Sequence, residues 1–105
     1  MKVSELTGAL LDYWVAKTAG RSVEIVDGQC QHTYGMCSVF SPSTNWSQGG
    51  PIIEREGMNQ YRQPDGIWYV FIKTPEIYSN ATGATLLIAA MRCYVASKFG
   101  NELPE

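Results

Sequence analysis

Several features that usually point to a function are missing from this chain of 105 residues. It has one histidine and three cysteines, and it contains no C-x-x-C, P-loop, G-x-S-x-G or H-E-x-x-H pattern. Cys30, His32 and Cys37 are a poor match to zinc-ligand spacings, and we expect these cysteines to be small apolar groups in a reducing compartment. The sequence therefore predicts neither a metal ion nor a cofactor.

Charged residues are also scarce, at 17% of the chain, with ten acidic and eight basic residues. No run of like charge exceeds two residues, which disfavours nonspecific nucleic-acid binding because that binding needs clustered Lys and Arg. The start M-K-V-S-E-L-T-G has no apolar signal region, and the longest apolar run, residues 86–91, is too short to cross a bilayer. We expect a cytoplasmic protein with a single domain over residues 1–105.

Hydrophobic periodicity predicts a helix near each end of the chain. Ser4 is the expected cap of a helix over residues 5–18, and Thr82 is the expected cap of one over residues 83–99. Strands are predicted over residues 22–26, 36–40, 60–63 and 67–73, and a loop over residues 74–83. The predicted fold is α/β in the α+β sense. It is a small sandwich in which long terminal helices pack on an antiparallel or mixed sheet of about four strands, with a short central helix.

The strand predicted over residues 67–73 is apolar on both faces. One face carries Ile67, Tyr69 and Phe71, and the other carries Trp68, Val70 and Ile72. We therefore expect both faces to be covered, either by helices or by a second copy of the protein. The surplus of apolar and aromatic surface favours a homo-oligomer.

Unusual residues concentrate in residues 40–57, which read F-S-P-S-T-N-W-S-Q-G-G-P-I-I-E-R-E-G. Ser43, Thr44 and Asn45 are successive helix-capping candidates, and a short turn that carries Trp46 is expected to follow them. Trp46 is expected either to plug the core or to line a pocket.

The second half of this stretch contains two adjacent glycines. Gly49 and Gly50 permit positive φ and the close approach of another group, and Pro51 is suited to begin a second helical turn over residues 52–56. Two helix starts within ten residues are expected to leave two sets of unpaired backbone N–H groups. Such an arrangement suits an anion.

The stretch at residues 40–57, the distal A-A-M-R-C-Y-V-A-S-K-F-G and the start M-K-V-S-E-L-T-G-A-L-L-D-Y-W-V-A resemble the NinX-like family of lambdoid and related enterobacterial phages. The resemblance covers nearly the whole chain and is loose around residues 26–36 and 74–81. More distantly, the chain is similar to phage ABA sandwich domains, in which a comparable S-T-x-x helix precedes a tryptophan-containing strand and an alanine-rich C-terminal helix. The resemblance implies a phage or prophage accessory protein in the bacterial cytoplasm, with no catalytic motif to transfer.

The candidate ligand-binding residues combine the central stretch with three arginines that could pair with phosphate. They are Ser43, Thr44, Asn45, Trp46, Gly49, Gly50, Arg55, Arg62 and Arg92. The hypothesis is a non-enzymatic, oligomeric anti-defence sponge that sequesters a nucleotide-derived host immune signal in a pocket shared by subunits.

Two alternatives stay open. One is an accessory factor that binds a host protein, since exposed aromatic residues serve that role equally well. The other is a small hydrolase acting on a nucleotide signal. It is less favoured because Glu54 and Glu56 diverge by about 200° on a helix and cannot act as an acid–base pair.

Overall fold

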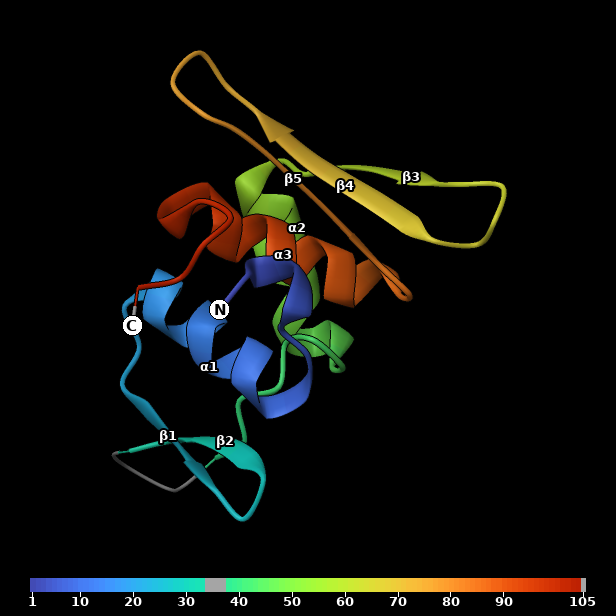
Figure 1. Cartoon of the computed structure of the whole chain (residues 1–105). Coiled ribbons are helices and arrows are strands. Elements are labelled where there is room, and N and C mark those ends of the chain that lie inside the picture. The colour runs from blue at the N-terminus through green and yellow to red at the C-terminus, as the bar shows by residue number, and fades with distance from the viewer. Residues whose placement is uncertain (34–37, 105) are drawn as a thin grey trace.

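The computed structural model describes residues 1–33 and 38–104 (Figure 1). In that part of the chain a 3₁₀ turn, η1 (Val3–Glu5), accompanies three α-helices and five strands. The helices are α1 (Gly8–Ala19), α2 (Trp46–Glu56) and α3 (Leu86–Phe99). The strands are β1 (Val23–Val26), β2 (Gln29–His32), β3 (Asn59–Arg62), β4 (Trp68–Lys73) and β5 (Tyr78–Gly83). The architecture is α+β, as predicted.

Helix α3 occupies the middle of the molecule, with other elements in layers around it (Figure 1). A three-stranded antiparallel sheet, in the order β3-β4-β5, packs against α3 through β4 and β5. Helix α1 packs against another side of α3, and the β1–β2 hairpin lies beyond α1. Because α3 has neighbours on several sides, half of its residues are buried and only Lys98 is exposed, and its sequence is apolar nearly all round.

The two terminal helices are present, but at 12 and 14 residues they are shorter than predicted. Thr7 is the N-cap of α1, and Ser4 lies in η1 instead. Thr85 caps α3 by accepting a hydrogen bond from the Ile88 amide, whereas the predicted cap, Thr82, belongs to β5. Neither these helices nor any other helix of the described residues is long and apolar enough to cross a membrane.

The prediction of one sheet of about four strands is wrong, because β1 and β2 form a separate hairpin. The turn residues Asp27 and Gly28 have φ values of 51° and 78°, as in the two-residue turns that suit hairpins. The second strand follows this turn at once and is therefore β2, not residues 36–40. Residues 36 and 37 lie outside the described residues, and Val39 makes only an isolated bridge to Gln31.

The predicted loop over residues 74–83 is also wrong, because six of its residues form β5, which pairs with β4. The inward side of β5 consists of Ser79, Ala81 and Gly83. A Cβ atom on Gly83 would lie only 2.7 Å from the backbone N of Ala89, so α3 approaches the sheet very closely there. Small inward residues permit this approach, but they leave no hydrophobic alternation by which the strand could be recognised.

Candidate functional site

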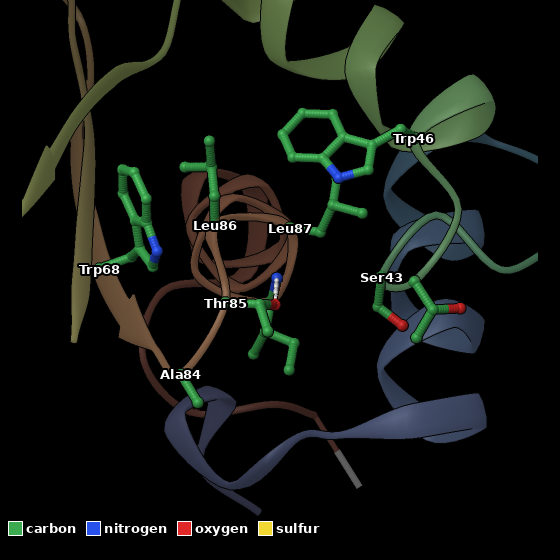
Figure 2. Close-up of a pocket in the computed structure, with 9 residues that line it drawn as sticks. Ser43, Trp46, Trp68, Ala84, Thr85, Leu86 and Leu87 are labelled. Atoms are coloured by element: carbon green, nitrogen blue, oxygen red, sulfur yellow. Dashed lines mark hydrogen bonds between the residues drawn. The ribbon is translucent and has the colours of Figure 1, made fainter. Parts of the chain in front are cut away.

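A pocket of about 480 Å³ lies where the starts of α2, α3 and β4 come together (Figure 2). This volume is within the range of roughly 300 to 1,000 Å³ that is usual for ligand pockets. The lining residues are Ser43, Thr44, Trp46, Trp68, Ala84, Thr85, Leu86, Leu87 and Ile88. Three of them, Ser43, Thr44 and Trp46, were predicted as site residues.

Trp46 forms one wall of this pocket. It is the first residue of α2, and 55% of its surface is exposed. Figure 2 shows its indole beside Leu87, with Trp68 on the far side of Leu86. Asn45 sets the start of the helix, because its side chain accepts from the amide of Ser47 at 2.9 Å. The indole is therefore part of the pocket and not a plug in the core.

The backbone amides that were expected to bind an anion are paired within the chain. The Ser43 amide donates to Oδ1 of Asp12 at 2.9 Å, and the next two amides donate to the Ser41 carbonyl at 3.1 and 2.9 Å. Amides in the first turn of α2 donate to the side chain and carbonyl of Asn45. The expectation of two sets of free N–H groups is therefore wrong, because the tight turn and the helix cap use these donors internally.

The two glycines lie inside α2, and neither has a positive φ. One continuous helix replaces the two predicted turns, with Pro51 within it. A Cβ atom on Gly49 would lie 2.6 Å from Cδ2 of Leu87 and would also overlap the Pro42 carbonyl oxygen. The close approach that Gly49 permits is therefore to α3 and to the preceding turn, and not to a ligand.

Two of the predicted cations lie away from the pocket. The Arg55 guanidinium donates to the hydroxyl of Tyr94 at 3.2 Å and to the carboxylate of Glu56 at 3.1 Å. Arg62 is exposed at the end of β3. The structure does not bring either side chain to Trp46 within one chain.

Arg92 also lies outside the pocket, where it holds two distant segments together. Its Nε donates to the carbonyl of Leu6 at 2.9 Å, and one terminal nitrogen donates to the carbonyl of Thr82 at 2.8 Å. Burial lowers the pKa of this guanidinium below its ordinary value. The two bonds give Arg92 a structural role between the N-terminal segment and β5.

Ser43 and Asp12 form a buried polar pair beside the pocket, with exposed fractions of 2% and 4%. Burial raises the pKa of the Asp12 carboxyl above its ordinary value, and the hydroxyl and amide of Ser43 oppose that rise. Ser43 thus acts on this carboxylate through its amide and its hydroxyl, although the Oγ has no hydrogen-bond partner of good geometry among the described residues.

The other six lining residues were not predicted as site residues. Trp68 begins β4, Ala84 and Thr85 connect β5 to α3, and residues 86–88 form the first turn of α3. The segment T-G-A-T-L-L offers Thr82 and Thr85 as alternative helix caps. Choosing Thr85 would have placed residues 86–88 at a helix start, but only the folded chain shows that this start meets Trp46.

Among the residues that the structure describes, no charged side chain lines the pocket. Its lining combines two indoles and the aliphatic side chains of α3 with the hydroxyl-bearing residues Ser43, Thr44 and Thr85. Such a surface favours burial of an aromatic or aliphatic group. It offers a phosphate group no cation with which to pair.

Cys30 and His32 are not arranged as a nucleophile and its base. Burial, together with a nearby carboxylate, raises the pKa of the Cys30 thiol to about 11, which keeps it protonated. His32 Nδ1 lies 2.9 Å from Oγ of Ser38, and Nε2 lies 3.4 Å from a guanidinium nitrogen of Arg21. Cys37 lies outside the described residues, among which no three His, Cys, Asp or Glu side chains gather to hold a metal ion.

Comparison with protein families matches residues 2–98 to the family described as bacteriophage P22, NinX. The chain belongs to the NinX family. The match spans nearly the whole sequence and includes all the pocket residues, and it confirms the resemblance seen in the sequence. No curated protein matches the chain. Membership of the NinX family is consistent with a phage accessory protein.

Proposed function

We propose that this NinX-family protein is a non-enzymatic accessory protein that acts by binding, with the pocket beside Trp46 as its binding site. The observation that carries the proposal is the exposed indole of Trp46 at the edge of an apolar, uncharged pocket. Aromatic side chains bury large areas and dominate interface energetics. An indole left open beside a ready-formed pocket can therefore contribute strongly to binding.

The lining residues support binding and not catalysis. They provide hydroxyl groups but no carboxylate, imidazole, amine or thiol that could act as an acid, base or activated nucleophile. Asp12 lies behind Ser43, and its carboxylate already accepts the Ser43 amide. The incubated ligand or partner should therefore be recovered chemically unchanged.

The chemistry of the walls favours an apolar side chain of a protein partner as the occupant. Trp46, Trp68 and Leu87 would surround such a side chain with hydrophobic surface. Full burial of one Leu, Ile, Phe or Met side chain contributes about 1.5 to 3 kcal/mol, which is the scale of an interface hot spot. The absence of charge at the pocket centre is also typical of the core of a protein interface.

Quantitative capture from bacterial cells tests this function. Tagged wild-type protein should retain a defined host or phage protein, and Trp46→Ala should reduce that protein at least about fivefold. Ile25→Ala is a matched control because Ile25 is 43% exposed but lies on β1, away from the pocket. Equal capture by all three proteins, each shown to be folded by its thermal unfolding, would contradict the proposed site.

The nucleotide sponge is a second candidate, because an exposed indole can also stack on a base. One such stack contributes about 1 to 3 kcal/mol, well short of the roughly 8 kcal/mol that micromolar binding needs. Since none of the described residues that line the pocket is a cation, phosphates of the ligand would have to be held by a second copy.

Thermal-shift screening against cyclic nucleotides and ADP-ribose derivatives distinguishes the two candidates. A sponge should be stabilised by one of these ligands, should lose that effect in Trp46→Ala and should release the ligand unchanged. No stabilisation by any of them, together with capture of a host protein, would favour the protein partner.

A further inference from the structure

The outer face of the three-stranded sheet carries aromatic side chains that no other described element covers. Residues paired directly across antiparallel strands share a face, and Tyr61 is opposite Tyr69. Phe71 is two residues further along β4 on the same face, and Tyr78 is opposite Lys73. We call Tyr61, Tyr69, Phe71 and Tyr78 the aromatic face.

The two faces of β4 show that only one of them is packed in a single chain. Val70 and Ile72 are buried against α3, and the helices lie on that side of the sheet (Figure 1). On the aromatic face, Tyr61 and Tyr78 are 58% and 61% exposed. The strand was predicted to be covered on both sides, and the single chain covers one.

The aromatic side chains form a continuous surface. The rings of Tyr69 and Phe71 have centroids 5.9 Å apart, and the hydroxyls of Tyr69 and Tyr78 lie 3.1 Å apart. Tyr61 extends this surface onto β3 through its pairing with Tyr69. Tyrosines in this arrangement present rigid apolar area together with polar tips, which is the composition enriched in protein interfaces.

The charges on this face decide between possible occupants. By register, Lys73 is the one charged strand residue beside the aromatic face; the others are Asn59, Asn80 and Thr82. Single-stranded nucleic acid also stacks on aromatic residues of sheets, but its affinity depends on several cations that track the phosphates. A second copy needs no such cations, because its matching face is almost uncharged.

The exposed area on this face suits a small interface between two chains. At about 200 Å² for a whole aromatic side chain, the exposed parts of Tyr61 and Tyr78 alone come to roughly 240 Å² per copy. The half-buried Tyr69 and Phe71 and the exposed polar residues of the same face add to this area, so two faces together approach the low end of the size range of specific interfaces, about 1,200 Å².

We propose that two copies of this protein associate through their aromatic faces to form a symmetric dimer. The same residues contribute from both copies, as a two-fold interface requires. The two sheets pack face to face, and Tyr61 and Tyr78 become buried. Trp68 precedes Tyr69 on β4, so its side chain lies on the opposite face of the sheet, where it lines the pocket. The pocket of each copy therefore stays open in the dimer.

Sedimentation equilibrium of the whole chain, from about 1 to about 200 µM, tests the dimer. The expected mass at high concentration is about 23 kDa, twice the 11.6 kDa of one chain. A mass of one chain throughout the range would overturn the proposal.

Variants then test the face. Tyr61→Lys and Tyr78→Lys should each raise the dimer dissociation constant at least about tenfold, because each introduces a charge at the interface. Ile25→Lys, on the distant hairpin, should leave it unchanged. If either tyrosine variant fails to fold by circular dichroism, Tyr→Ser at the same position replaces it. A dimer that is insensitive to these variants would overturn the proposal, as would a monomer that binds an oligo-dT strand through the same tyrosines.

Discussion

Two parts of this protein, the stretch over residues 41–57 and the three-stranded sheet, each present one side to α3 and another side to solvent. Where each of them comes closest to α3 it has a glycine, with Gly49 against Leu87 and Gly83 against the backbone of Ala89. The solvent sides carry large aromatic residues such as Trp46. The difference indicates that close packing on α3 specifies the fold, whereas the exposed aromatic residues are available for binding.

The largest effect should come from breaking the close packing of α2 on α3. Gly49→Ala should destabilise the protein by about 3 kcal/mol, because the new methyl group meets backbone as well as Leu87. Gly50→Ala is the matched control. A Cβ there would lie 3.7 Å from the Trp46 ring, an ordinary contact, so replacing a helical glycine should raise stability by about 0.5 to 1 kcal/mol. Urea unfolding measures the change in stability of each variant. If Gly49→Ala and Gly50→Ala change stability in the same direction, the claim that only Gly49 is closely packed against α3 is wrong.

A second effect should follow from removing the bridge between the N-terminal segment and β5. Arg92→Ala loses two hydrogen bonds from a charged group and should destabilise the protein by about 2 kcal/mol. Arg62→Ala, at an exposed arginine of β3, should change the free energy of unfolding by less than about 0.5 kcal/mol. If Arg92→Ala is as mild as Arg62→Ala, the structural role of Arg92 is wrong.

The buried carboxylate should produce a smaller, pH-dependent effect. Because burial raises the pKa of Asp12, the folded protein binds this proton more tightly than the unfolded chain, and stability falls as pH rises through the raised pKa. Asp12→Asn keeps an acceptor for the Ser43 amide without the buried charge. In acid, where Asp12 is protonated in the folded and the unfolded protein, Asp12→Asn should therefore have the same free energy of unfolding as wild type. Towards neutral pH the variant should become more stable than wild type.

Unfolding titrations of Asp12→Asn at acidic and neutral pH measure this difference. Asp12→Ala serves as the control, because it also lacks the carboxyl but leaves the Ser43 amide unpaired, and it should be less stable than Asp12→Asn by about 1 to 3 kcal/mol at every pH. If Asp12→Asn instead becomes less stable relative to wild type as the pH rises, the pKa of Asp12 is not raised in the folded protein.

The smallest effect on stability should come from the solvent side. Trp46→Ala should change the free energy of unfolding by less than about 1 kcal/mol, because the indole is more than half exposed. Differential scanning calorimetry of Trp46→Ala and wild type measures this change in stability and shows whether the variant still unfolds in one cooperative transition. Unfolding of the variant would show that Trp46 belongs to the core, and the proposed binding site would then fail.

The parts of the fold with strong local signals could be predicted from the sequence. The apolar residues of β4, the periodicity of the terminal helices and the end of α2 at Gly57 agree with the structure within a few residues. Strands β2 and β5 were missed because their sequences, Q-C-Q-H and Y-S-N-A-T-G, are polar or small. The Asp27-Gly28 pair carried a usable hairpin signal for β2, whereas β5 is stabilised by its tertiary contacts with α3.

The candidate site could be predicted only in part. Ser43, Thr44 and Trp46 were found because unusual residues clustered locally, but the other half of the pocket comes from β4 and α3. The partners of Arg92, which lie at Leu6 and Thr82, are likewise tertiary contacts. The local sequence identified candidate hydrogen-bond donors and cations, but in the folded chain most of them bind partners within the protein.

Photo-crosslinking at position 46 tests the central claim most directly. Trp46→p-benzoylphenylalanine keeps an aromatic ring at the pocket wall and captures any protein that contacts it in the bacterial cell. The same substitution at Ile25 provides the control on another exposed surface. We expect a defined protein partner crosslinked at position 46 and absent at position 25. No crosslinked protein at position 46, or the same products from both positions, would contradict the claim that this pocket is the binding site.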